Sequence, residues 1–528
     1  QYTHNVLVPG SSPGGPTNLM ENKLKNNFLF LLTSFLIFIF HQILFQKFFP
    51  NNEGYLGHDF EQFVPNLMFG KIWFEKNFLS IPWFTPSFCC GIPFYADPQS
   101  TFYSFYQLIF ILFDPIFSIK LIFFILSLFS YLGMFLLVRK FRFSKYSSLL
   151  CASLFLFNGF FIYRSIIGHV AYLSYIFVPL YCFFLIKSYE KKLHKYSIFY
   201  LLLSSIFFAN FFHSGSGPII LIIFTSIFFV ILFYAHFQNT LKIFLNFFIS
   251  LLLGFLISLS KIVSSLFLLS NFPREYPPTE FNSFLGYLKN FFLSFFLEAD
   301  QKYFNENLTS IISFGKHEME YSLSIVPIIS LFLIALFHKK LLKINLRNFN
   351  FLFILAIIFI IPIYFNINFL NQYNINSQIP VIKSTWVQFR WMAIYIIPII
   401  LLTGLLIENT KINIRYKNYI SIAFILILLI QNFNKDNKNY LQSASYNIQD
   451  SYDFNEKFEK GQIKPRINGP SVLLNKDGTL KIISTRNDTF YFSYSSLMCY
   501  QSLFGYNLEN LNKKNIKFYS KKILGDGS

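Results

Sequence analysis

Long apolar segments separated by short polar ones make up the chain from residue 27 to residue 432. A helix needs about 20 mostly apolar residues to cross a hydrocarbon core of about 30 Å, and roughly eleven segments meet this requirement. The predicted spans lie at 27–46, 115–138, 146–163, 168–186, 196–212, 217–236, 243–269, 321–337, 348–367, 389–407 and 417–432. No small-residue cleavage site follows the first of them, so it is predicted to be a retained span rather than a signal peptide.

The polar segments between the predicted spans alternate between two kinds. Segments of the first kind are basic, and they comprise Lys23 and Lys25 together with 139–145, 187–195, 338–347 and 411–417. Segments of the second kind are mixed in charge and hold nearly all the acidic residues before the tail; they comprise 47–114, 164–169, 213–216, 270–320 and 368–388. Because basic loops remain in the cytoplasm, the amino end is predicted to lie inside and the chain beyond residue 432 outside.

Two of the outer segments, 47–114 and 270–320, are long. Each contains a stretch, at 63–80 and at 281–300, in which large apolar residues interleave with polar ones. Such amphipathic stretches predict short helices that lie on the bilayer surface. We therefore expect an all-α polytopic transmembrane domain at 20–432.

The two ends of the chain differ from this pattern. Residues 1–19 are rich in Gly, Pro and Ser and are predicted to be a non-native or disordered leader, with Met20 as the natural start. The tail, 433–528, loses the apolar runs, and Asp477-Gly478 between two alternating stretches predicts a β-hairpin. The tail is therefore expected to be a small, strand-rich extracytoplasmic domain, and its abrupt end suggests that the natural protein continues.

The composition agrees with a membrane protein whose main partner is the lipid bilayer. The chain is 54% hydrophobic and 13% charged, whereas soluble domains carry about a quarter charged residues. A net charge of +19 would suggest nucleic acid in a soluble protein, but the basic residues lie between spans, so no nucleic-acid partner is expected. No P-loop, dinucleotide fingerprint, HExxH motif or paired-cysteine motif supports nucleotide hydrolysis, redox or zinc-protease chemistry.

Ionisable residues gather at the outer ends of the predicted spans. They are Asp59, Glu61, Asp97, Arg164, His169, His213, Lys261, Arg274 and Arg390. Proteins that only transport place such groups near the bilayer midplane, on broken helices or facing cavities. The distribution therefore predicts an active site at the boundary between membrane and water.

Asp59, in Gly57-His58-Asp59, is the candidate general base, because a base close to an attacking hydroxyl contributes about 10²–10⁴ in rate. Glu61 lies two residues further on and either shares this role or joins Asp59 in holding a divalent cation. Two carboxylates are a weak metal signal, and no cofactor is required by the sequence. The alternative is that Asp59 is an ordinary solvated loop acid.

Three basic residues are predicted to grip an anion at the outer rim. Lys261 lies near the outer edge of the predicted span 243–269, Arg274 follows that span, and Arg390 opens the span 389–407. A lysine that only snorkels to the surface is the alternative for Lys261. For His169 and His213, at outer helix ends, a structural or interfacial role is favoured over catalysis.

Several stretches resemble YfhO-like membrane proteins, which belong with the GT-C glycosyltransferases. The resemblance covers most of 27–407 loosely and is best in the first 150 residues; it is carried by 57–65, 81–110 and 168–180, and further on by 260–275 and 384–399, which contain Arg274 and Arg390. The matching positions in the first half are Asp59, Pro65, Pro86, Gly91, Pro93, Ala96, Asp97 and Gln99.

This resemblance implies a GT-C glycosyltransferase of the bacterial inner (cytoplasmic) membrane. Such an enzyme takes a polyprenyl-phosphate sugar as donor, acts on a glycan, lipid or protein acceptor outside the cytoplasm, and uses an Asp like Asp59 as base. The expected substrate-binding residues are His58, Asp97, Gln99, Arg164, His169, Lys261, Arg274 and Arg390. The alternatives are a transporter or flippase of lipid-linked glycans, a polysaccharide polymerase of another membrane family, and a non-catalytic assembly factor.

Overall fold

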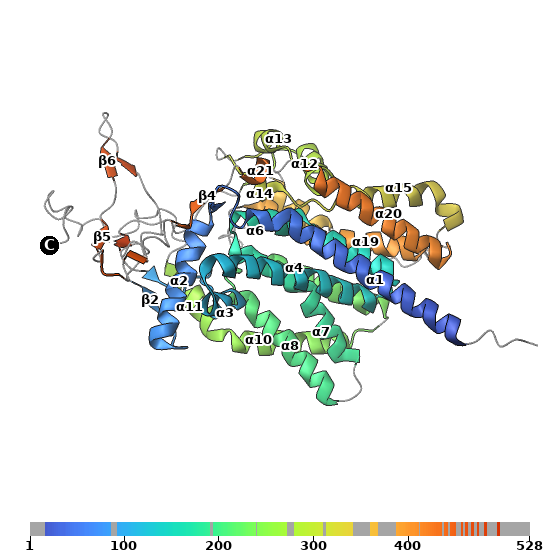
Figure 1. Ribbon diagram of the computed structural model, residues 1–528, viewed down its shortest axis with the longest axis horizontal. Coiled ribbons are helices and arrows are strands. Elements are labelled where there is room, and N and C mark those ends of the chain that lie inside the picture. Colours follow the sequence, from blue (N-terminus) through green and yellow to red (C-terminus); the bar gives the residue numbers. More distant parts are fainter. Residues whose placement is uncertain are drawn as a thin grey trace, which may run out of the picture.

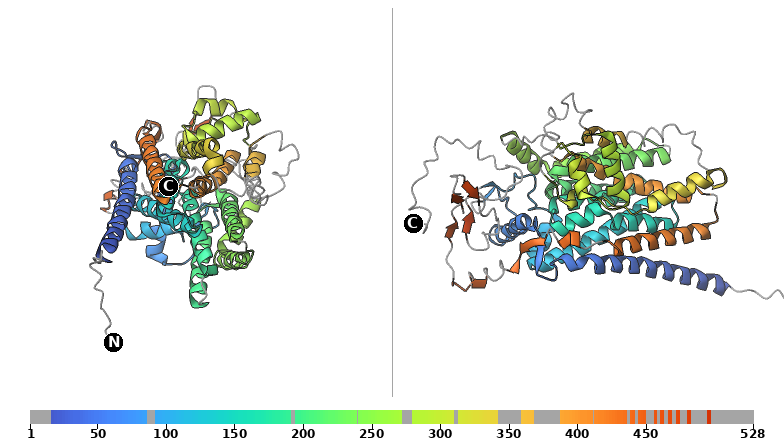
Figure 2. Two further views of the ribbon diagram at one scale, coloured as in Figure 1. Left: turned by 90° about the vertical axis from the view of Figure 1, so that its right-hand side faces the viewer. Right: turned by 90° about the horizontal axis from the view of Figure 1, so that it is seen from above.

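The computed structural model describes residues 16–341 except 86–91, 191–193, 239, 272–278 and 310–312, then 359–367 and 387–435 except 411, and short stretches of the tail between 438 and 496. Helices dominate (Figure 1), and an end-on view shows them gathered in a bundle (Figure 2). Eight of the described helices are long and apolar enough to cross a membrane: Asn27–Phe48, Pro115–Lys140, Lys145–Ile167, Val170–Glu190, Lys195–His213, Gly217–Phe237, Gln388–Glu408 and Ile414–Phe433. The chain is therefore a mostly helical polytopic membrane protein.

These eight helices coincide with eight of the predicted spans. The predicted span 243–269 is broken into α10 (Ile243–Ile257) and α11 (Leu259–Asn271), which meet at an angle of 71°. The predicted span 321–337 corresponds to α15 (Val326–Leu341), whose 16 residues are fewer than a typical span requires. Most of 348–367 lies outside the described residues, so the predicted number of spans stays a prediction.

Some of these long helices consist of one named element and others of two. The membrane region consists of α1 (Pro16–Phe45) with η1 (Gln46–Phe48), α4 (Pro115–Lys140), α5 (Lys145–Leu156), α6 (Gly159–Ile167), η2 (Val170–Phe177), α7 (Val178–Glu190), α8 (His194–His213), η3 (Gly217–Ile219), α9 (Ile220–Phe237), η5 (Gln388–Tyr395), α19 (Ile396–Glu408) and α20 (Ile414–Phe433). Because α1 begins at Pro16, the end of the predicted leader is helical rather than disordered, and residues 1–15 lie outside the described part.

Local sequence determines where the central helices begin. Asp114 accepts a hydrogen bond from a backbone N–H of the first turn of α4, and Pro115 takes the first helical position, where its missing N–H costs nothing. Ser144 and Asn158 cap α5 and α6 in the same way. These caps satisfy donors that the ends of helices otherwise leave unpaired.

Burial separates a central layer from a peripheral one. The most apolar part of Lys145–Ile167 is completely buried, whereas only 28% of that of Asn27–Phe48 and 22% of that of Ile414–Phe433 is buried. The peripheral helices therefore expose apolar side chains to their surroundings, which is favourable only in lipid or at a partner surface.

The two kinds of loop lie at opposite ends of the bundle. The 26 residues of α4 cover about 39 Å at 1.5 Å per residue. At its carboxyl end, Lys140 of one basic loop pairs with Glu190 of the next. At the other end, Asp59 of one outer segment donates its backbone N–H to the carbonyl of Ile167 in another, at 3.0 Å. An alternating topology requires this arrangement.

The two amphipathic stretches are helical, as predicted. They form α2 (Phe60–Asn77) and α12 (Phe284–Phe296). The other elements of the outer segments are β1 (Tyr55–Gly57), β2 (Phe84–Thr85), β3 (Ile92–Pro93), α3 (Phe105–Leu112), α13 (Gln301–Glu306) and α14 (Lys316–Met319).

The described part of the tail contains one short helix and several strands. They are α21 (Lys438–Leu441), β4 (Ala444–Asn447), β5 (Arg466–Asn468), β6 (Val472–Leu474), β7 (Leu480–Ile482) and β8 (Tyr494–Ser496). β6 and β7 pair antiparallel, as the predicted hairpin requires, although its Asp477-Gly478 turn lies outside the described residues, and β5 pairs with β8 in parallel. β4 pairs antiparallel with β1, so the tail contacts the segment that leads directly to Asp59. In Figure 1 the red strands of the tail lie at the same end as α2.

Candidate functional site

Two Gly-His motifs, Gly57-His58 and Gly168-His169, pack against each other at the end of the bundle opposite the basic loops. Gly57 lies against the backbone at the end of α6 and leaves no room there for a Cβ atom. Gly168 has φ +96° at the end of α6, where a Cβ would lie 2.6 Å from the backbone nitrogen of Phe60. Only glycine accepts both the close approach and the left-handed conformation. This contact brings Asp59 and His169 together.

Asp59 and His169 form a carboxylate–imidazole pair. Nε2 of His169 contacts Oδ2 of Asp59, and the two side chains are only 10% and 16% exposed, respectively. Nε2 of His58 lies 3.4 Å from Oδ1 of the same carboxylate, and the side chain of His58 is 42% exposed. Asp59 is therefore held from one side by a buried imidazole and approached from the other by one that faces solvent.

The pKa of Asp59 follows from these neighbours. Burial alone would raise the pKa of the carboxyl, but the charge of His169, the hydrogen bond with it, and the charges of His58 and His317 together lower it from 3.8 to about 2. The carboxylate is consequently ionised at every physiological pH. It accepts hydrogen bonds and does not act as an acid there.

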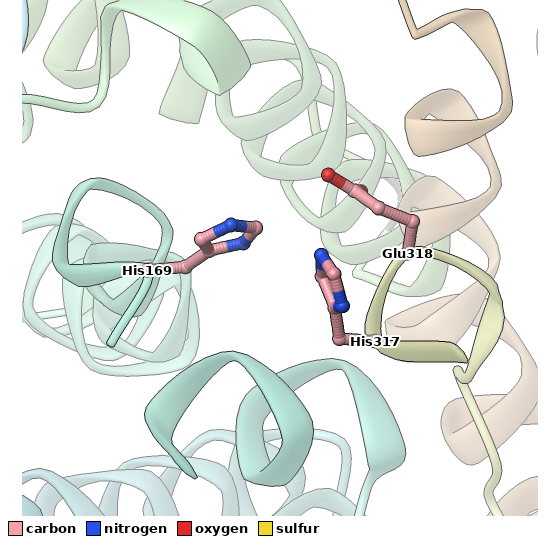
Figure 3. Close-up of side chains that lie close together, drawn as sticks. All are labelled: His169, His317 and Glu318. Carbon is pink, nitrogen blue, oxygen red and sulfur yellow. The ribbon is translucent and has the colours of Figure 1, made fainter. Parts of the chain in front are cut away.

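The short helix α14 adds His317 and Glu318 to the cluster. The ring of His317 lies 5.0 Å from that of His169 and 5.6 Å from that of His58, measured between centroids. Burial is the main cause that lowers the pKa of His317 to about 3, so its imidazole is neutral at physiological pH. Figure 3 shows His169 approaching from one segment while His317 and Glu318 come from α14.

Glu318 is clamped by two arginines. Nη2 of Arg164 donates to Oε2 of Glu318 at 2.9 Å, and Arg390 donates from Nε to the same oxygen at 3.0 Å and from Nη2 to Oε1. Arg164 also donates to the carbonyl of His317 at 2.9 Å. Although burial opposes ionisation, the charges of Arg390 and Arg164 hold the pKa of Glu318 well below its usual value. Both guanidinium groups lie over the ring of Tyr172.

The structure brings together five of the predicted site residues. They are His58, Asp59, Arg164, His169 and Arg390. Glu61 lies in the first turn of α2, close by in the chain. Arg274 lies outside the described residues.

The ammonium of Lys261 is bonded to backbone carbonyls of another outer segment and to none of the side chains described above. It donates to the backbone carbonyls of Tyr95, Asp97 and Ser100 at 2.7, 2.5 and 3.2 Å. An ammonium has three N–H donors, so these bonds use its whole capacity. Asp97 is itself buried, and its Oδ1 accepts from the backbone N–H of Gln99 at 2.8 Å. Lys261 therefore contacts the segment of Asp97 and Gln99 in this structure, and its predicted role in binding a phosphate stays a prediction.

Sequence reasoning missed His317 and Glu318. Both lie in the stretch 315–320, inside the long outer segment 270–320. The available signal was an adjacent His and Glu in an outer loop of a chain with only nine histidines. In comparisons with protein-family models, curated proteins and solved structures, the chain has no significant match.

Proposed function

We propose that the chain is a GT-C-type glycosyltransferase, similar to the YfhO-like proteins, that transfers a sugar from a polyprenyl-phosphate donor to an acceptor hydroxyl. The observation that carries this proposal is the buried cluster in which Asp59, paired with His169, lies beside two arginines. Ionised carboxylates and guanidinium groups at one end of a membrane bundle suit a reaction that releases a proton and a phosphate.

In this reaction Asp59 accepts the proton of the acceptor hydroxyl as that oxygen bonds to the anomeric carbon of the sugar. The bond from the anomeric carbon to the donor phosphate breaks with its electron pair, and the lipid phosphate leaves as an anion. Glycosyl transfer passes through an oxocarbenium-like transition state, in which the attacking hydroxyl becomes strongly acidic. A carboxylate with a pKa of about 2 is therefore basic enough to take the proton late in the step.

In this proposal His169 positions the base, and Arg390 stabilises the leaving phosphate. Because Oδ2 of Asp59 is held by His169, Oδ1 is the oxygen that faces His58 and the more exposed side of the cluster. Arg390 donates two of its five N–H groups to Glu318. Its remaining donors supply the charge-assisted bonds that a departing phosphate needs.

We further propose that the cluster faces the extracytoplasmic side of the bacterial cytoplasmic membrane. The basic loops at the opposite end support this orientation through the positive-inside rule. The full proposal has the amino end in the cytoplasm, roughly eleven spans and the tail 433–528 outside. A reporter fused after Asn432 would test it, because a cytoplasmic readout there would place Asp59 on the wrong side for a lipid-linked donor.

One observation favours the transporter alternative. The pair α10 and α11 is bent by 71°, and broken spans often form binding sites in transporters. However, such sites are usually formed by matching broken spans in two repeats, and the described residues contain one such pair. The lysine that follows the bend has its three donors bonded to carbonyls, as described above.

The deciding experiment is a donor assay. Purified protein in nanodiscs is incubated with a panel of polyprenyl-phosphate sugars, and release of the free lipid phosphate is measured with and without acceptor glycans. A glycosyltransferase releases lipid phosphate from one donor of the panel, and Asp59→Asn abolishes the release. Movement of an intact lipid-linked sugar across the bilayer without bond cleavage would establish the transporter instead.

A further inference from the structure

Two buried imidazoles in the cluster each keep a ring nitrogen without a hydrogen-bond partner. His169 presents Nε2 to the Asp59 carboxylate, while its Nδ1 is buried and has no partner in the described part of the chain. Nδ1 of His317 is also buried and has no partner in the described part of the chain. A neutral imidazole that donates one N–H carries its lone pair on the other nitrogen. His169 therefore offers an unused lone pair in a buried site.

Glu318 completes a set of three ligand groups. One ligand atom each from His169, His317 and Glu318 lies within 4.8 Å of the other two. Figure 3 shows the ring of His169 and the side chains from α14 around a shared space. A carboxylate offers about four lone pairs, and the bonds from Arg164 and Arg390 occupy three. One lone pair of Glu318 thus remains on Oε1.

We propose that His169, His317 and Glu318 bind one divalent transition-metal ion, for which zinc is the best fit. Two imidazoles and one carboxylate are a common donor set for zinc sites that keep a fourth position open, whereas magnesium and calcium prefer oxygen ligands alone. Tetrahedral zinc with bonds of about 2.0 Å separates its ligand atoms by roughly 3.3 Å. The three ligand atoms, which lie within 4.8 Å of one another, would therefore have to approach one another by at most about 1.5 Å to bind the ion.

Asp59 orients His169, one of the three proposed metal ligands. Histidines that bind metals usually donate their second N–H to a carboxylate, which fixes the ring and strengthens the ligand. The Asp59–His169 pair has this arrangement, and the backbone N–H of Asp59 is anchored on the carbonyl of Ile167. The orientation of His169 is thus set by a rigid contact between two outer segments.

The net charge of the cluster indicates what a bound ion would do in the proposed reaction. Two carboxylates, of Asp59 and Glu318, are balanced by the guanidinium groups of Arg164 and Arg390, so the cluster with neutral imidazoles carries no net charge. A divalent ion makes it doubly positive and offers a coordination position to a phosphate oxygen. This use of the ion rests on the proposed glycosyl transfer, whereas metal binding rests on the three side chains alone.

The experiment measures metal binding separately from activity. The full chain, purified in detergent with a tag that contains no histidine, is analysed for metals by inductively coupled plasma mass spectrometry. The apo protein is then titrated with Co²⁺, whose visible absorption reports tetrahedral coordination. We expect about one zinc ion per chain and intense Co²⁺ bands that zinc removes. Magnesium should not compete.

His317→Gln, which retains most of the side-chain volume, should lose the ion and the Co²⁺ bands. His213→Gln changes another histidine at an outer helix end and should keep both. Gel filtration and circular dichroism establish that each variant folds; if His317→Gln does not, Glu318→Gln is compared in the same titration. Absence of bound metal and of Co²⁺ bands in the folded parent overturns the proposal, as does full retention of metal by a folded His317→Gln protein. A parent that binds zinc but releases no lipid phosphate would contradict the proposed function and leave the metal site established.

Discussion

Two groups of buried charges each include residues of an outer segment, and they differ in how completely their polar atoms are hydrogen-bonded. The ammonium of Lys261 donates to three carbonyls within 95–100 and has no donor left. The cluster of Asp59 and Glu318 also pairs its charges, but the two imidazoles within it keep unpartnered nitrogens. Since buried polar groups are nearly always satisfied, the complete pairing of Lys261 favours a structural role, whereas the unpartnered nitrogens of the cluster leave it able to bind a ligand.

The comparison also explains why the predicted position of an ionisable residue near a membrane boundary did not identify its role. Both groups are ionisable residues close to a membrane boundary, and such residues are functional candidates by default. Lys261 attaches the segment of Asp97 to the bent pair of helices, and its partners are more than 160 residues away in sequence. A single sequence does not contain that distance information.

The largest effect is expected for Asp59→Asn. If Asp59 takes the acceptor proton, the amide cannot replace it, and activity should fall by at least about 10². Release of lipid phosphate by the nanodisc protein is the measurement. The protein should still fold, because the amide keeps the size of the side chain and one oxygen that can face His169.

Asp59→Glu serves as the matched variant for this prediction. It keeps the charge but moves the carboxylate by one methylene, so it should retain more activity than Asp59→Asn. Unchanged activity in Asp59→Asn would contradict the proposed catalytic role of Asp59. The Asp59 cluster would then no longer differ from Lys261 in function.

The sequence predicted the helices better than it predicted the cluster. Apolar runs of span length were sufficient for eight helices. The pairing of Arg164 with Glu318 joins residues 154 positions apart, through a helix of four residues inside a long loop. Neither periodicity nor local motif encodes such a contact.

Lys261→Met should be the most destabilising of the changes considered. It leaves three carbonyls without donors, each costing about 1–3 kcal/mol, while removing the cost of burying an ammonium. We expect a net loss of about 2–3 kcal/mol, seen as a lower thermal midpoint in detergent. Donor affinity of the protein that remains folded should be close to that of the parent. A large loss of donor affinity without loss of stability would show that Lys261 binds the donor phosphate, as the sequence predicts.

Arg390→Ala should weaken donor binding about 10- to 100-fold, because a charge-assisted hydrogen bond contributes about 1.5–3 kcal/mol. Arg390→Lys should recover part of this loss, since the planar fork is absent. The affinity for a non-hydrolysable polyprenyl-phosphate sugar is measured in nanodiscs.

Glu318→Gln separates the two roles of Arg390. In the metal-free protein it weakens the ion pair but keeps the guanidinium, so donor affinity measured without added divalent metal should be retained or increased. If Arg390→Ala binds the donor as tightly as the parent, the arginine serves only to hold Glu318, and this part of the cluster is as structural as Lys261.

The low pKa of Asp59 predicts a smaller, pH-dependent effect on stability. The folded-state pKa of about 2 lies below the ordinary value of 3.8, so the ionised carboxylate contributes about 2 kcal/mol that is present above about pH 4 and lost as the pH falls through 2. The thermal midpoint of the parent should therefore approach that of Asp59→Asn between pH 4 and 2, with a constant difference from pH 5 to 7. Glu456→Gln, at a largely exposed carboxylate, is the control. A difference that stays constant down to pH 2 would show that Asp59 is not paired as described.

The smallest effect is expected for Glu61→Gln. Glu61 lies in the first turn of α2, where a negative charge stabilises the helix by about 0.3–1 kcal/mol through the helix dipole. The cluster described around Asp59 is built from His58, His169 and α14, so lipid-phosphate release should fall by less than about threefold, equivalent to about 0.6 kcal/mol. The assay is the one used for Asp59→Asn, with the thermal midpoint recorded in parallel. Equal losses of activity from Glu61→Gln and Asp59→Asn would mean that the two carboxylates act together, and Glu61 would then belong with the cluster rather than with the structural charges.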